Sequence, residues 1–260
     1  MASGTMQPCG VKVEADILSA RGIILDVVDG LGSAIFGAKA NPLDNLTLPP
    51  LASHKILQQS TTDNSRYPTR NDLLHAIWNT LVSSRTEVRT KATSVSEAVY
   101  FMFTSVAISR EEWPFEDIWK WDQFDEVRSF HAKNAMLKFA GKPFSDWITI
   151  AMEVYEPNID AYVDNPTDEF RTLKGHFENT VIDRRLLVTA SGYIGHVPND
   201  TQCGDAICIL YGMDVPVVLR QSQDGTYELI GPYYVHCVMG GELMDDMQNG
   251  VFEERIFNIA

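Results

Sequence analysis

The sequence predicts an α+β protein in which a small antiparallel β-barrel packs against a mainly helical middle region. Three patterns predict this class: short apolar strands separated by turn residues at 184–242, strand-forming residues at 11–36, and helical periodicity at 71–181. Short strands at near-regular spacing are typical of small barrels. At 260 residues and 45% hydrophobic content, the chain can bury a substantial core as a single compact domain.

The N-terminal part predicts two strands that join the barrel. Residues 11–36 are rich in valine, isoleucine and leucine, which favour extended backbone. The two strands are expected to meet around Ala20-Arg21-Gly22. Residues 37–70 contain four prolines and a polar run at 58–65, which predict an extended loop. The sequence leaves open whether this loop acts as a lid.

The middle of the chain predicts a first helix that begins near residue 71. Asn71 or Asp72 is expected to cap it, because apolar residues then recur at helical spacing as far as Leu81. Ser94 and Glu97 have the spacing of a capping box, in which each side chain bonds the backbone N–H of the other. A second helix is therefore expected after Ser94.

Three more helices are expected before the barrel. Apolar residues recur at three- and four-residue steps after Pro114, which predicts a long helix that ends at Gly141. Two further helices are expected at 145–155 and 167–181. The barrel region then covers 184–242, and the last residues, 243–260, are expected to form a tail.

The barrel region carries a series of short motifs that alternate apolar strand residues with glycine-containing turns. In order they are RRLLVT at 184–189, GYIG at 192–195, GDAIC at 204–208, PVVLR at 216–220, GTYELIG at 225–231 and YVH at 234–236.

Together these motifs resemble the C-terminal region of fungal heterokaryon-incompatibility (HET) proteins, over residues 184–242. Residues 17–26, ILSARGIILD, resemble the segment that follows the N-terminal HET domain in those proteins. The resemblance implies a HET-related chain without the HET domain itself. Within the motifs, His196 stands where the family pattern has a small or apolar residue.

Composition and absent motifs exclude several classes of function. The net charge of -14 opposes binding to nucleic acid, whose affinity depends on lysine and arginine. No signal peptide and no apolar run of about twenty residues is present, so we expect a cytoplasmic protein without a membrane segment. The four cysteines lack zinc-site spacing, and no nucleotide-binding loop or hydrolase motif occurs, so no cofactor is expected.

One acidic cluster has the pattern of a metal site. Asp122, Asp125 and Glu126 would share one helix face, as carboxylates do where a helix binds magnesium and a diphosphate. A solvated acidic face is the more common origin of such a cluster, and no second metal motif accompanies it. We therefore expect no metal.

The barrel offers the better candidate site, because it concentrates tyrosine, histidine and arginine. We predict that His196 is the general acid–base group, assisted by Tyr193, with Arg185 holding an anionic oxygen. Histidine suits this role because its ordinary pKa lies near neutrality. A packed, structural His196 is the competing hypothesis. The residues expected to bind substrate are Tyr211, Tyr234, His236 and Arg220.

Two functions follow from these observations. The first is a cofactor-independent enzyme of fungal secondary metabolism that acts on a bulky apolar polyketide or terpenoid substrate, held between the helical part and the barrel. Here the chain resembles fungal hetero-Diels–Alderases of tropolone-sesquiterpene pathways, which implies dehydration to a quinone methide followed by cycloaddition. The second is a non-catalytic interaction module inherited from a HET protein. An enclosed cavity that His196 enters favours the enzyme, whereas a filled barrel favours the module. Whether the chain forms a homodimer is left open.

Overall fold

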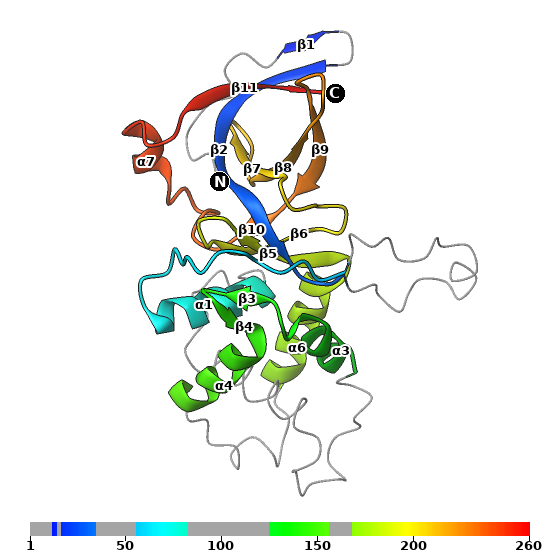
Figure 1. Cartoon of the computed structure of the whole chain (residues 1–260), viewed down its shortest axis with the longest axis vertical. Helices are drawn as coiled ribbons and strands as arrows, with labels where there is room; N and C mark the ends of the chain where they lie inside the picture. The colour runs from blue at the N-terminus through cyan, green and yellow to red at the C-terminus, as the bar shows by residue number, and fades with distance from the viewer. Residues whose placement is uncertain (1–11, 15–16, 35–55, 83–124, 156–167) are drawn as a thin grey trace, which may run out of the picture.

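The computed structural model describes residues 12–14, 17–34, 56–82, 125–155 and 168–260. Figure 1 shows strands at one end of the molecule and helices at the other, with part of the sheet between them. The predicted α+β class is confirmed in this form: a nine-stranded, mostly antiparallel sheet packs against helices.

The centre of the sheet is the long strand β2 (Ile17–Leu31), which pairs with four other strands. The prediction of two strands around Ala20-Arg21-Gly22 is wrong, because β2 runs through these residues without a turn. Gly22 faces Leu210 of the neighbouring strand β7 (Ala206–Leu210), and a Cβ atom at Gly22 would overlap the carbonyl oxygen of Ile209. The glycine therefore allows two backbones to approach closely. The short strand β1 (Lys12–Glu14) pairs with the start of β2.

Five strands form a closed ring. From β2 the pairing passes to β11 (Glu254–Ile259), β9 (Tyr227–Pro232), β8 (Val217–Gln221) and β7, which pairs with β2 again. An antiparallel barrel was predicted, but the pairing of β11 with β9 is parallel. The ring is therefore mixed at this one pairing.

The C-terminal segment 243–260, which was expected to be a tail, contains the short helix α7 (Met244–Gln248) and the ring strand β11. β11 is amphipathic: Phe257 and Ile259 are buried, whereas the alternate residues Ile256 and Asn258 are exposed. This alternation is typical of a strand with one face in a core. The tail prediction is corrected accordingly.

The interior of the ring is filled with side chains. Alternate residues of the ring strands meet in one apolar cluster. Its buried members are Ala20, Cys208, Leu210, Val217, Leu219, Phe257 and Ile259. Cys208 is buried in this cluster and packs there as a small apolar residue.

The second half of β2 continues the sheet toward the helices. There β2 pairs with β5 (Arg184–Thr189), β5 with β6 (Ile194–Pro198), and β6 with β10 (Tyr234–Val235). β5 has two buried faces, because Leu186 and Val188 belong to the core with the helices whereas Leu187 belongs to the core toward the ring. This part of the sheet therefore separates two cores.

Helix α1 (Arg70–Leu81) packs its apolar side into the helical core. Its N-cap is Thr69, slightly before the predicted Asn71 or Asp72. The Thr69 hydroxyl oxygen accepts from the Asp72 backbone N–H at 3.2 Å, and the Asp72 carboxylate accepts from the Thr69 N–H at 3.0 Å. Such a reciprocal capping box satisfies two N–H groups at the helix start. The pattern expected at Ser94 lies outside the described residues.

The other helices agree with the sequence except at one end. Helices α4 (Phe144–Tyr155) and α6 (Asp168–Val181) occupy the expected segments. The long helix that was expected to reach Gly141 ends earlier, since α3 (Asp125–Asn134) is followed by a small hairpin of β3 (Lys138–Phe139) and β4 (Lys142–Pro143). Ala140 and Gly141 connect these strands with φ angles of 47° and 76°, which an α-helix does not contain.

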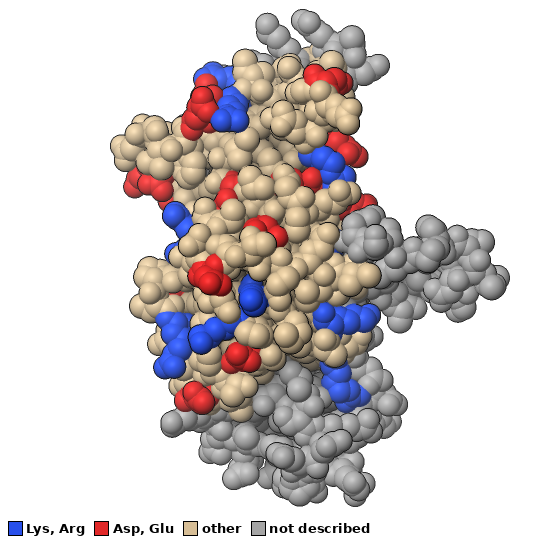
Figure 2. Space-filling model, in the orientation of Figure 1, with Lys and Arg blue, Asp and Glu red and all other residues tan. Residues whose placement is uncertain are grey.

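The face of the molecule drawn in Figure 2 is mixed in charge. Figure 2 shows basic and acidic side chains interspersed over the described part of this face. Among the helices of the described ranges, none has both the length and the apolar run needed to cross a membrane.

Candidate functional site

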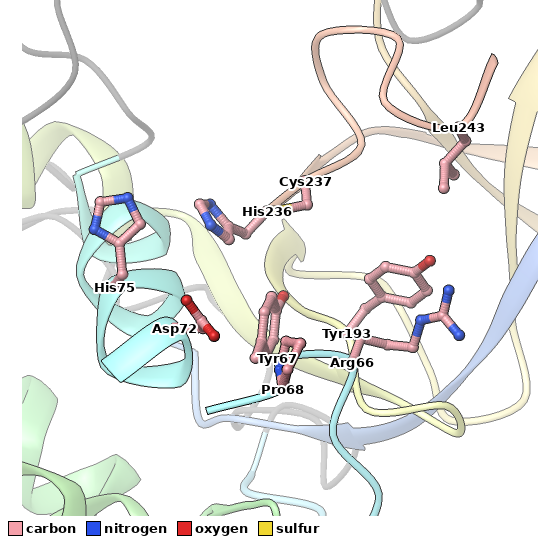
Figure 3. Close-up of a pocket in the computed structure, with 9 residues that line it drawn as sticks. All are labelled: Arg66, Tyr67, Pro68, Asp72, His75, Tyr193, His236, Cys237 and Leu243. Atoms are coloured by element: carbon pink, nitrogen blue, oxygen red, sulfur yellow. The ribbon is translucent and has the colours of Figure 1, made fainter. Parts of the chain in front are cut away.

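The candidate site is a pocket of about 430 Å³ between the start of α1, the turn that joins β5 to β6, and the segment that follows β10 (Figure 3). Its volume lies in the range of small-molecule sites. The described residues that line it are Arg66, Tyr67, Pro68, Asp72, His75, Tyr193, His236, Cys237 and Leu243.

The sheet places His236 at the wall of this pocket. The preceding strand β10 pairs with β6, and the His236 backbone N–H donates to the carbonyl oxygen of Ile194 at 3.1 Å. A Cβ atom at Gly195 would overlap the carbonyl oxygen of Tyr234, so the glycine lets β10 approach β6 closely. Cys237 then turns the chain with a φ of 64°.

The imidazole of His236 lies among other rings. Its centroid is 5.8 Å from that of Tyr67 and 5.6 Å from that of His75, the latter in an edge-to-face arrangement at 75°. The Tyr234 hydroxyl and the His236 Nδ1 are 3.4 Å apart. His236 therefore joins the loop before α1, α1 itself and β10 in one cluster of rings, visible in part in Figure 3.

A second group at the pocket is formed by Arg66 and Tyr193. The guanidinium carbon of Arg66 lies 5.0 Å from the centre of the Tyr193 ring, which is a cation–π distance. Burial raises the pKa of the Tyr193 hydroxyl, and the neighbouring Arg66 partly offsets this effect. The Tyr67 hydroxyl is engaged with the backbone, since it accepts from the Ile194 N–H at 3.1 Å.

His196, the predicted acid–base group, does not line this pocket. It is buried on β6 and stacks on Tyr234, with ring centroids 5.3 Å apart and planes 18° apart. Tyr234 in turn contacts His236. Three of the predicted site residues thus form a row in which only His236 reaches the pocket.

The Arg185 side chain is hydrogen-bonded to backbone carbonyl oxygens. It is fully buried, and its guanidinium donates to the carbonyl oxygens of Gly32 at 2.7 Å, Thr201 at 3.0 Å and Ile56 at 2.8 Å. Burial lowers its pKa to about 10. These bonds hold three segments together, and the predicted role of binding an anionic oxygen would require breaking them.

The two remaining predicted residues lie on the ring, away from the pocket lining. Arg220 pairs with the carboxylate of Asp205 through bonds of 2.9 and 2.8 Å. Tyr211 lies beside Glu254, and its pKa is raised by burial and by that carboxylate. The structure therefore brings together Tyr193 and His236 at the pocket, with Tyr234 behind them.

One side of the pocket was not predicted from the sequence. It is formed by Arg66, Tyr67 and His75. They come from the predicted loop and the first helix, far from the barrel in sequence. No local motif marks them. Only the recurrence of aromatic and ionisable side chains just before a predicted helix start was available as a signal.

A smaller pocket of about 250 Å³ lies between α3 and α4, where His131 is its buried titratable group. The His131 ring stacks on Phe144, with centroids 5.0 Å apart, and burial lowers its pKa to about 3. Within the described residues, no group of three or more His, Cys, Asp or Glu side chains is placed to hold a metal ion. Asp122 of the predicted acidic face lies outside them.

Part of the chain is similar to a known domain family. Residues 171–252 match the Het-6 beta-barrel domain family. This stretch contains the strands from β5 to β10, including three strands of the ring.

One curated relative is heterokaryon incompatibility protein 6, OR allele, of Neurospora crassa. The two chains are 36% identical over 72 residues, which is 26% of this chain and 11% of the relative. The predicted resemblance to the C-terminal region of HET proteins is confirmed. The comparisons do not support the similarity to hetero-Diels–Alderases. No solved structure matches the chain.

Proposed function

We propose that the chain is a non-catalytic recognition module related to HET proteins, which binds a ligand in the pocket around His236. The observation that carries this proposal is the composition of the pocket: rings from three separate segments surround it, and charged groups lie at its edge. Ligand sites typically combine apolar and aromatic walls with a few convergent polar groups.

The placement of the predicted catalytic residues supports binding over chemistry. His196 is separated from the pocket by Tyr234, and Arg185 is held by three carbonyl oxygens. The ring interior is filled by side chains, so it offers no substrate chamber among the described residues. The similarity to a HET protein points in the same direction.

The proposal is tested by a thermal-shift screen of small aromatic acids, amides and amines. His75→Ala and His236→Ala remove ring walls of the pocket, whereas Tyr211→Ala removes a tyrosine that does not line it. A compound that stabilises the wild type and the Tyr211 variant, but neither histidine variant, supports the proposal. If no compound binds, or if both histidine variants bind a compound as tightly as the wild type, the proposal is wrong.

A second candidate is a cofactor-independent enzyme on an apolar substrate, favoured by the contact of the Tyr234 hydroxyl with His236 Nδ1. In this scheme an acid–base group protonates the leaving hydroxyl of a 2-(hydroxymethyl)phenol and accepts the phenolic proton, so that water leaves and a quinone methide forms for cycloaddition. The histidine available for this role at the pocket is His236, because His236 lines the pocket and His196 does not. The expected absence of nucleic-acid binding, the possible homodimer and the apolar substrate remain predictions.

Product formation from such a phenol and an alkene, measured after dialysis against a chelator, tests the enzyme. His236→Gln is expected to lower turnover by roughly a hundredfold, because general acid–base catalysis contributes ~10²–10⁴-fold. His196→Gln is the matched comparison, and a larger loss there would restore His196 as the catalytic group. Absence of turnover above the uncatalysed rate in the wild type excludes this candidate.

A further inference from the structure

We propose that the pocket binds aromatic carboxylates, with the ligand ring among Tyr67, Tyr193 and His236 and the carboxylate on Arg66. This inference rests on the proposed function, because it names the ligand class of the same pocket. It is carried by three observations: the aromatic walls, an arginine that has no carboxylate partner within the described ranges, and the existing contacts of the groups that would otherwise bind a cationic ligand.

The walls favour an aromatic ligand. Tyr67 is buried and its hydroxyl is bonded to the Ile194 backbone, so the side chain contributes its ring to the pocket. His236 stands 5.8 Å from that ring, and Leu243 adds an apolar side chain. Aromatic side chains prefer tilted or edge-to-face contacts at such centroid distances. A further ring would extend the existing cluster.

Arg66 favours an anion. The chain has 35 acidic and 21 basic residues, yet Arg66 forms no ion pair with any Asp or Glu of the described residues. Its guanidinium rests on Tyr193, which fixes the position of the group while leaving N–H donors for a ligand. A guanidinium matches a carboxylate with two parallel hydrogen bonds.

The same geometry disfavours a cationic ligand. Asp72 is a carboxylate at the pocket, but its Oδ2 accepts from the Thr69 N–H at 3.0 Å and from the Thr69 hydroxyl at 2.7 Å. These bonds hold the start of α1. The Tyr193 ring is already in contact with a cation, Arg66. Figure 3 shows Asp72 on α1 and the Arg66 guanidinium beside Tyr193, and these two described side chains form no ion pair with each other.

Calorimetric titration with matched acids and amides tests the inference. The probes are 3-phenylpropanoate against 3-phenylpropanamide, and the peptide Ala-Ala-Ala-Phe with a free or an amidated C-terminus. We expect each acid to bind the wild type at least about tenfold more tightly than its amide, because a hydrogen bond between two charged groups is stronger than one to a neutral amide. Tighter binding by the small acid identifies a free metabolite as the source, and tighter binding by the peptide identifies a chain terminus.

Arg66→Gln is the deciding variant. Arg66 is exposed, so the variant is expected to fold. It should abolish the preference for the acid by weakening acid binding at least about tenfold and amide binding by less, whereas Arg70→Gln, which removes an equal charge that does not line the pocket, should keep the preference. Equal binding of acid and amide in the wild type would overturn the ligand class but leave the recognition module standing. If neither these probes nor any compound of the wider screen binds, both proposals fail.

Discussion

His196 stacks on Tyr234 with their ring centroids 5.3 Å apart, and the Tyr234 hydroxyl lies 3.4 Å from Nδ1 of His236. The histidine that departs from the family pattern is therefore coupled to the pocket through a tyrosine. This arrangement follows from the register of β10 on β6, in which Tyr234 faces His196 directly. Cross-strand ring pairs stabilise a sheet, so the stack has a structural role whatever the pocket binds.

Replacement of His196 by alanine is expected to lower the free energy of unfolding by ~1–3 kcal/mol. The reason is that a buried imidazole and its contacts with Tyr234 are lost. Chemical denaturation beside ligand titration measures both effects, and we expect ligand affinity to change less than in His236→Ala. A fully stable His196→Ala protein that has lost all activity would favour the catalytic hypothesis instead.

Arg185→Met is expected to be among the most destabilising substitutions. It leaves the carbonyl oxygens of Gly32, Thr201 and Ile56 without their donor, and each stranded buried acceptor costs ~1–3 kcal/mol. Arg184→Met, at a partly exposed neighbour, should cost less than about 1 kcal/mol. Urea denaturation compares the two. Wild-type stability of Arg185→Met together with lost ligand binding would show that Arg185 belongs to the site.

Gly22→Ala is expected to lower the free energy of unfolding by ~1–3 kcal/mol, as overpacking does. The added methyl group would overlap the Ile209 carbonyl oxygen, and β2 and β7 would have to separate. Gly175→Ala is the matched control, because no atom lies within 4 Å of a Cβ there. This change in α6 should stabilise the protein by ~0.5–1 kcal/mol. Equal stabilities for the two variants would contradict the close approach.

The stability of the protein should fall below neutral pH in a way that depends on His131. Burial lowers the pKa of His131 from 6.5 to about 3, so between these pH values the unfolded chain binds the proton and the folded chain does not. The unfolded state then gains protons as pH falls, and stability decreases by up to ~1.4 kcal/mol per pH unit. Above about pH 6.5 His131 is neutral in both the folded and the unfolded state, so the protein has the full stability there.

His131→Leu removes this proton while keeping an apolar side chain between α3 and α4. Between pH 7 and pH 5 the wild type should lose about 2 kcal/mol more than the variant. Urea denaturation at both pH values gives the difference, in which the other titrating groups cancel. Parallel pH profiles would mean that His131 is protonated to the same extent in both states.

Most elements could be predicted because their signals are local. The capping pattern before Leu73, the amphipathic runs of α4 and α6, and the short apolar strands separated by turns from β5 to β10 each depend on neighbours along the chain. The predictions failed where the structural role of a residue depends on a contact with a residue far away in the sequence. Gly22 resembles a turn residue in sequence, yet it serves the approach of Ile209.

The candidate site was only half predictable for the same reason. Tyr193 and His236 belong to motifs of the barrel region, and both line the pocket. Arg66 and His75 come from a different part of the chain, and the position of the loop before α1 against β6 decides that they join them. His196 has the chemistry of an acid–base group, but strand register places it behind Tyr234.

By itself, the sequence determined the class of the fold, the place of most helices and strands, and the resemblance to HET proteins, because hydrophobic periodicity and turn residues act over a few positions. Only the tertiary structure decided that the last strand closes the ring, that Arg185 is a buried brace, and that the pocket forms between α1 and β10. Pairing between strands distant in sequence and the burial of side chains depend on the whole chain at once. No local pattern encodes which residues will face the same space.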